Sequence, residues 1–473
     1  MDNKYKKLAK NSFWTLAGNA GSKMLGFLLL PLYTHWLGTA GFGETDLVTT
    51  YSSFLVSIMT LCVSDAIFVF TKNRENNVKK TFFSTSIAFI IAILCIWGGL
   101  WYLLDIIFTT YSINNSFSNN LWYIYGIVVS TFWQTYSQQF ILSLEKIKIY
   151  SLSGTILTIL TFIFSYLLIP TMGVRGYIFS MIMANLITGC YSFIFTKSYR
   201  YFSQQKIEWK KMNDVLKYSL PLIPNAIMWW LVGALNRPIM EYNLSYSEIG
   251  IFAVANRFPS VITMIFTVFS TAWTISVFEE YGKKDFEDFY KKTFRMTFFF
   301  ITLVACVVIF FSKDIIMIFA TPDFFDAWKF MIILIISAAF SCISSFLGTC
   351  FNVTKKSNYF FYSSVWGAGT AIILNFILIP LWGLWGTSLS VLLSFAVIMI
   401  SRYKYSLKYI PISLTYYIFK YAIVLIIMSI GIYFIDSNGI KIAFVSFLLI
   451  VFVFSERQIF TPMIVTIKSK RKL

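Results

Sequence analysis

The sequence predicts an all-α polytopic membrane protein with about fourteen transmembrane helices. Of its 473 residues, 58% are hydrophobic and 13% are charged, whereas soluble proteins carry about 45–50% apolar and about 25% charged residues. The mean hydropathy is +0.71, which leaves too little polar surface for a soluble enzyme. A net charge of +18 would suggest a nucleic-acid partner in a soluble chain. In a membrane protein it predicts basic cytoplasmic loops instead, and no nucleic acid.

Apolar runs of about 20 residues, the length that crosses the hydrocarbon layer, recur along the whole chain. They lie at 11–36, 45–70, 81–105, 120–143, 150–170, 174–196, 215–238, 247–275, 293–311, 327–351, 358–380, 384–401, 412–435 and 440–460. The loops between them are short and leave no room for a soluble catalytic domain. We therefore expect a transporter and not an enzyme.

The distribution of basic residues predicts that both termini face the cytoplasm. With the N-terminus inside, the segments that face the cytoplasm are rich in Lys and Arg, as at 72–80, 197–217 and 402–408. The opposite side carries only Arg175, Lys313, Lys329 and Lys441. A miscounted span would reverse every later loop and destroy this bias. The pattern predicts a multi-pass membrane protein with both ends in the cytoplasm, and the family resemblance described below implies the cytoplasmic (plasma) membrane of a bacterium.

The chain contains an internal repeat. At a spacing of 207 residues Pro31 matches Pro238 and Gly43 matches Gly250, and at 210 residues Pro170, Gly173 and Gly176 match Pro380, Gly383 and Gly386. Each copy contains six spans, so the copies are parallel, as in one known transporter design. This predicts a six-helix bundle at 1–196, a cytoplasmic linker at 197–217, a second bundle at 218–402, and helices 13–14 with a basic tail at 403–473. We expect a cavity between the bundles with alternating access.

The segment FLLLPLYTHWLGTAGFGETDL (27–47) resembles the first-helix signature of the Wzx-type polysaccharide flippase family. That family belongs to the MATE-like multidrug/oligosaccharidyl-lipid/polysaccharide superfamily, and both LIPxxGxxG elements look like its helix 5–6 and 11–12 turns. The resemblance covers essentially the whole chain. It implies that an undecaprenyl-pyrophosphate-linked oligosaccharide is flipped from the inner to the outer leaflet, for capsule, O-antigen, teichoic-acid or similar cell-envelope polysaccharide. Membrane lipids and the polymerase and glycosyltransferases of that pathway are the implied partners.

Three basic residues lie within predicted spans, where an ionisable group is costly and therefore a functional candidate: Lys23 and Arg257 near mid-depth, and Arg237 in the outer part of its span. A lipid pyrophosphate carries at least two negative charges, and Arg and Lys bind phosphate well. We expect these residues to form a cationic substrate site. The structural alternatives are that Lys23 pairs with Asp65 and that Arg237 extends to the outer headgroups.

Other residues suggest coupling and movement. Asp65 is a candidate for H+ or Na+ coupling, although it could instead cap a helix. Pro221, Pro224 and Pro259 predict kinks that act in gating or only in structure. Lys420 is expected to extend towards the cytoplasmic headgroups. The six cysteines lack metal-ligand spacing and His35 is the only histidine, so neither a metal nor a cofactor is expected.

Two alternatives use the same scaffold: a drug or metabolite cation antiporter, and a peptidoglycan lipid-precursor flippase. The antiporter would be expected to bury carboxylates, whereas the deep charges here are mainly basic. The precursor flippase would share the cationic cavity, and only the signature at 27–47 argues against it. A membrane polymerase or glycosyltransferase would need catalytic acids or large outer loops.

Overall fold

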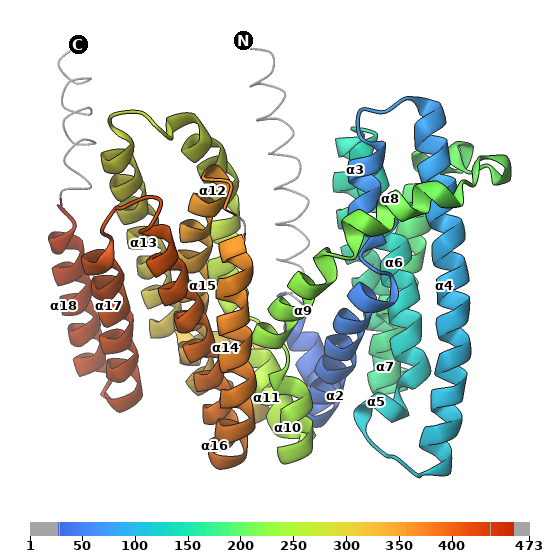
Figure 1. The fold of residues 1–473 in the computed structure, drawn as a ribbon. Coiled ribbons are helices and arrows are strands. Elements are labelled where there is room, and N and C mark those ends of the chain that lie inside the picture. The colour runs from blue at the N-terminus through green and yellow to red at the C-terminus, as the bar shows by residue number, and fades with distance from the viewer. Residues whose placement is uncertain (1–26, 28, 357, 436, 458–473) are drawn as a thin grey trace, which may run out of the picture. The chain divides into compact units, whose positions relative to one another are not determined.

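A computed structural model describes residues 27, 29–356, 358–435 and 437–457, and every regular element in these ranges is a helix. The chain divides into two compact units. The first comprises the described part of Met1–Trp230 together with Leu244–Gly250, and the second comprises Leu231–Asn243 and the described part of Ile251–Leu473. Within each unit long helices run beside one another (Figure 1). The predicted all-α multi-pass fold is confirmed.

Long apolar helices make up most of the first unit. In chain order its elements are α2 (Leu30–Met59), α3 (Val63–Thr71), α4 (Asn76–Thr110), α5 (Ser116–Asn119), α6 (Leu121–Ser143), α7 (Ile147–Phe195), the 3-10 helices η1 (Ser198–Tyr201) and η2 (Gln204–Lys206), α8 (Trp209–Ser219) and most of α9 (Leu222–Gly233).

The second unit contains the remaining helices. They are α10 (Asn236–Asn243), the later part of α11 (Tyr246–Ala255), α12 (Pro259–Glu280), α13 (Phe286–Phe310), α14 (Ser312–Phe319), the 3-10 helix η3 (Pro322–Phe324), α15 (Ala327–Val353), α16 (Asn358–Ser406), α17 (Thr415–Phe434) and α18 (Asn438–Ser455).

The 49-residue helix α7 is a hairpin of two antiparallel spans. Its backbone leaves the helical conformation at Gly173, where φ is 56° and ψ is −128°. The hydroxyl oxygens of Ser165 and Ser180 are 3.0 Å apart, although 15 residues of straight helix would separate them by about 22 Å. The chain therefore reverses at Gly173, between the predicted spans 150–170 and 174–196.

Helix α16, also of 49 residues, turns back in the same way. Its break is at Gly383, where φ is 53° and ψ is −126°. Across this hairpin Arg402 Nε donates to Ser363 Oγ at 3.0 Å, although the two residues are 39 positions apart. The repeat-equivalent glycines thus have nearly the same backbone conformation.

The last glycine of each LIPxxGxxG motif lets the two arms of the hairpin approach. A Cβ built on Gly176 would lie 2.2 Å from the carbonyl oxygen of Leu168, and one built on Gly386 would lie 1.9 Å from that of Leu378. No side chain fits at such distances. Each motif therefore needs two glycines: the first for its backbone conformation and the second for the close contact between the arms.

Nine helices in the described ranges are long and apolar enough to cross a membrane, or ten if the bent pair α2–α3 is one span. This number takes α7 and α16 as one helix each, so each hairpin adds a crossing. Helix α6 corresponds to the span expected at 120–143 and has 23 residues, but it is not among the nine. The first expected span, 11–36, lies mostly outside the described residues. The number fourteen therefore stays a prediction.

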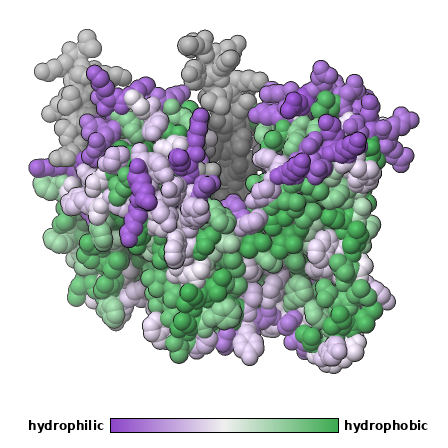
Figure 2. Space-filling view, viewed as in Figure 1, coloured by the Kyte–Doolittle hydropathy of each residue, from purple (hydrophilic) through white to green (hydrophobic). Residues whose placement is uncertain are grey.

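One end of the first unit brings together segments that the charge pattern assigns to the cytoplasm. Lys146 Nζ donates to the carbonyl oxygen of Thr196 at 2.8 Å, which joins the start of α7 to its end. The N–H of Ser203 donates to Ser84 Oγ in α4 at 2.8 Å, and α8 packs against α3 and α4. Hydrophilic side chains gather over α8 (Figure 2). The segment expected as a linker, 197–217, is thus docked on this unit.

Helix α15 forms the core of the second unit and is almost wholly buried. Its Phe346 stacks on Trp273 of α12 with ring centroids 4.2 Å apart. Phe294 and Phe298 of α13 contact the Phe346 ring edge-on. Helix α17 packs against α13 and α15, and α18 packs against α17. Helices α17 and α18, which correspond to the two expected spans outside the repeat, therefore attach to the rest of the second unit chiefly through α17.

Candidate functional site

Asp65 lies beside a break in the second predicted span. Leu61 and Cys62 separate α2 from α3 with φ of 51° and 52°, and the two helices meet at a bend of 49°. Asp65 is in the first turn of α3, where its backbone N–H donates to the Cys62 carbonyl oxygen at 3.1 Å. Its side chain is exposed on the first unit. Interrupted helices line the ion and substrate sites of many transporters, which makes Asp65 a candidate by its position.

Arg237 lies at the break between α9 and α10 and is only 4% exposed. Its Nη1 donates to the Gly233 carbonyl oxygen and to Asn236 Oδ1, both at 2.8 Å. The guanidinium also lies 5.0 Å from the centre of the Phe252 ring in α11. It therefore satisfies a carbonyl at the end of α9 and ties this break to α11. Such burial does not fit an arginine that extends to the headgroups.

Arg257 lies in the break between α11 and α12, and its side chain is exposed on the second unit. Its carbonyl oxygen accepts from the N–H of Ser260 at 3.2 Å and from Ser260 Oγ at 2.5 Å. Helix α12 begins at Pro259. Pro221 lies between α8 and α9, and Pro224 lies in the first turn of α9.

The described candidates share one local feature, which is an interruption in an apolar helix. Arg237 and Arg257 flank α11 in the second unit, whereas Asp65 belongs to the first unit. Lys23 lies outside the described residues. Broken helices commonly form the substrate and ion sites of transporters, and an arginine there can hold phosphate through two parallel N–H bonds.

A second charged cluster, which sequence reasoning missed, lies in the second unit around Glu456. This carboxylate is fully buried and accepts from Arg295 Nη2 at 2.8 Å, Lys420 Nζ at 2.8 Å and Tyr421 Oη at 3.2 Å. Lys420, expected to extend towards the headgroups, is therefore ion-paired. The available signal was an acid placed at the end of the last apolar span, immediately before a basic tail.

A family model described as "Polysaccharide biosynthesis protein" matches residues 8–281, more than half of the chain. The chain belongs to this polysaccharide biosynthesis family. The resemblance seen in the sequence is confirmed. A second family model, MatE, matches residues 221–377, which agrees with the MATE-like superfamily. A protein of the Lsg locus of Haemophilus influenzae is 23% identical over 351 residues, which are 71% of this chain and 82% of the relative.

Solved structures share the fold of this family member. The lipid II flippase MurJ in its inward closed conformation has a TM-score of 0.72 and 16% identity, covering 94% of this chain and 99% of MurJ. An inward-facing multidrug resistance MATE transporter has a TM-score of 0.63 and 13% identity, covering 84% of this chain and 93% of that one. At these identities the likeness shows the fold. The protein is a multi-pass helical membrane protein with a MurJ- and MATE-like architecture.

Proposed function

We propose that the protein is a flippase that carries an undecaprenyl-pyrophosphate-linked oligosaccharide from the inner to the outer leaflet of the plasma membrane by alternating access. The observation that carries this proposal is the polysaccharide biosynthesis match over residues 8–281. The fold shared with a lipid II flippase supports a lipid-linked substrate. The flipped glycan serves a capsule, O-antigen, teichoic acid or similar polymer, which separate glycosyltransferases and a polymerase build. The protein itself catalyses no covalent step.

In this proposal the pyrophosphate meets a cationic site made by Lys23, Arg237 and Arg257. Charge on the substrate is costly to desolvate, and a fixed guanidinium or ammonium offsets that cost. Arg257 is exposed at its helix break and contacts the phosphate oxygens. Arg237 adds positive charge from a buried position while its bonds to Gly233 and Asn236 hold the neighbouring break.

The topology and the ion coupling in this proposal rest on charged residues. Both termini lie in the cytoplasm of a bacterial cell, as the basic segments indicate. Asp65, beside the break between α2 and α3, binds the coupling H+ or Na+. The helix breaks near Pro221, Pro224 and Pro259 supply the local movement that changes access to the site.

The test replaces Arg257 by Gln in a strain whose surface polysaccharide depends on this protein. Outer-leaflet glycan, measured per unit of membrane-inserted protein, should fall by about 10-fold or more because a charge-assisted bond to phosphate is lost. Arg257→Lys should keep more activity than Arg257→Gln. The matched control is Lys284→Gln, an exposed cation between α12 and α13, which should behave as the wild type. Wild-type flux in Arg257→Gln would contradict the cationic site.

Two further candidate functions have one observation each. The MatE match at 221–377 favours a cation antiporter, and in that case loss of the protein would sensitise cells to cationic dyes and leave surface glycan unchanged. The likeness to MurJ favours a peptidoglycan-precursor flippase, and in that case depletion would stop growth. Loss of one surface polysaccharide without either effect supports the proposed function.

A further inference from the structure

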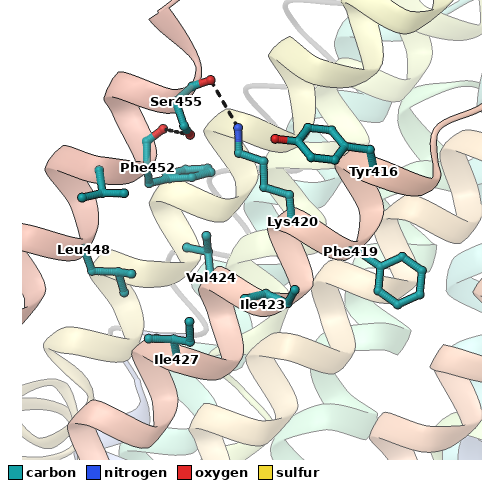
Figure 3. Close-up of a pocket in the computed structure, with 10 residues that line it drawn as sticks. Tyr416, Phe419, Lys420, Ile423, Val424, Ile427, Leu448, Phe452 and Ser455 are labelled. Carbon is teal, nitrogen blue, oxygen red and sulfur yellow. Dashed lines mark hydrogen bonds between the residues drawn. The ribbon is translucent and has the colours of Figure 1, made fainter.

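A groove runs between α17 and α18 and has a volume of about 420 Å³. Most of its lining is apolar. Phe419, Ile423, Val424 and Ile427 of α17 and Leu448, Val451 and Phe452 of α18 line it, together with Tyr416, Lys420 and Ser455. Apolar side chains occupy its length, and Lys420 lies at one end with Nζ directed at the Ser455 carbonyl oxygen (Figure 3). The groove is therefore apolar along its length and basic at its end.

A polar pocket of about 370 Å³ adjoins that end, and we call it the cationic cup. It shares Tyr416, Lys420 and Ser455 with the groove and is also lined by Arg295, Tyr417, Phe454, Glu456 and Arg457. The lining thus holds three cations and one carboxylate, which leaves the cup with an excess of positive charge. The cup lies at the end of α18 that the proposed topology places in the cytoplasm.

We propose that an anionic glycerophospholipid of the bilayer binds here, with one acyl chain in the groove and its phosphate and headgroup at the cationic cup. Basic pockets between transmembrane helices on the cytoplasmic side are known to bind anionic lipid headgroups. Charge complementarity selects an anionic headgroup, and each buried CH₂ of the chain adds apolar contact. Ile423 and Val451 are 50% and 48% exposed, so the groove opens sideways and a bilayer lipid can enter laterally.

The cup is organised before any lipid arrives. The buried Glu456 carboxylate holds Arg295 Nη2 and Lys420 Nζ, both at 2.8 Å. Two of the three N–H groups of Lys420 point at Glu456 and at the Ser455 carbonyl oxygen. Because these side chains are already ordered, a lipid phosphate meets them at little further entropic cost.

This site is independent of the proposed transport function. The groove lies beyond residues 8–281 and 221–377, the two segments that the family models match, and Arg295 is the one lining residue of the cationic cup that falls inside the second segment. Its residues belong to the two helices that stand outside the sequence repeat and to α13. Lipid binding can therefore succeed or fail in an assay that measures no flipping.

The test is native mass spectrometry of the purified full-length protein with phosphatidylglycerol, phosphatidylcholine or undecaprenyl phosphate. The wild type should retain phosphatidylglycerol in preference to phosphatidylcholine. Arg457→Gln leaves both ion pairs of Glu456 in place and should weaken phosphatidylglycerol binding about fivefold, with little change for phosphatidylcholine. The control Lys441→Gln, at the opposite end of α18, should leave both unchanged.

A second pair of variants tests the groove. Ile423→Trp fills it and should lower retention of both phospholipids, whereas Ile430→Trp, which lies outside the lining at a similar exposure of 52%, should not. If Ile423→Trp does not yield folded protein, Ile427→Phe replaces it. Equal binding of the two phospholipids by the wild type, or equal effects at 423 and 430, would overturn the proposal. Preferred retention of undecaprenyl phosphate would also overturn it and assign the groove to a polyprenyl chain.

Discussion

Gly43 in α2 and Gly250 in α11 touch through their backbones, and they occupy equivalent positions in the two sequence repeats. A Cβ built on Gly43 would lie 2.0 Å from the Tyr246 carbonyl oxygen, and one built on Gly250 would lie 2.0 Å from that of Thr39. Thr39 and Tyr246 are themselves separated by the repeat spacing of 207 residues. The contact is therefore reciprocal, and both helices need glycine at the crossing point.

Replacing either glycine by alanine should destabilise the protein. At 2.0 Å from a carbonyl oxygen the new methyl group must push α2 and α11 apart, at a cost of about 1–3 kcal/mol. Thermal unfolding followed by size-exclusion chromatography would show a lower midpoint for Gly43→Ala and for Gly250→Ala. The double variant should cost less than the sum of the two, because the helices are already separated. The control Gly99→Ala has no atom within 4 Å of the new Cβ and should not lower the midpoint.

The hairpin glycines should respond to alanine for a different reason. No atom lies within 4 Å of a Cβ on Gly173, and the same holds for Gly383, yet their φ of +56° and +53° is a conformation that alanine rarely adopts. Each substitution should cost about 1–3 kcal/mol of backbone strain. Gly369→Ala, in an open helical position of α16, serves as the control. Thermal midpoints of Gly173→Ala and Gly383→Ala equal to that of the control would contradict the hairpin geometry.

Removing the Glu456 carboxylate should weaken the attachment of α17 and α18 to the rest of the second unit. Glu456→Gln leaves Arg295 and Lys420 partly buried without their shared counter-ion, and breaking a buried pair costs about 3–5 kcal/mol. Limited proteolysis should then cleave the 407–414 loop faster. Glu280→Gln removes one carboxylate from the exposed pair with Lys283, which is worth about 0–1 kcal/mol. Equal effects of the two variants would show that the Glu456 cluster stabilises the protein no more than an exposed ion pair does.

Substitution at Asp65 tests ion coupling. In energised spheroplasts, outer-leaflet glycan should appear at a rate that depends on a proton or sodium gradient. Asp65→Asn cannot release a proton or bind a cation through a carboxylate, so its rate should fall to the value measured without a gradient, while Asp65→Glu should keep some response. Asp214→Asn, which removes an exposed acid on α8, is the control. A normal gradient response in Asp65→Asn would exclude this residue as the coupling site.

Single cysteines test the predicted sidedness. In a background without the six native cysteines, a membrane-impermeant thiol reagent applied to intact cells should label Ser437→Cys and leave Gln204→Cys unlabelled. Both positions are exposed and lie between or beyond apolar helices, so lack of labelling reports location and not burial. Permeabilised cells should show labelling at both positions. Labelling of position 204 in intact cells would reverse the assigned topology.

The sequence by itself determined the multi-pass helical class and the family, and it showed the internal repeat. It also marked Gly173, Gly176, Gly383 and Gly386 as special positions. These features are predictable because they are local. The length of an apolar run decides whether a helix can span the membrane, and only glycine tolerates both a positive φ and a neighbouring carbonyl at van der Waals contact.

Tertiary structure alone decided which charges meet. Arg295 and Glu456 are 161 residues apart, and nothing in either segment names the other as its partner. Arg237 is predicted to be a substrate cation, and the fold adds that its guanidinium donates to a carbonyl oxygen and an amide oxygen at its own helix break. A buried charge must find a counter-charge or a hydrogen-bond partner, but packing selects that partner. Sequence therefore shows where a charge is costly, and only the fold shows what compensates it.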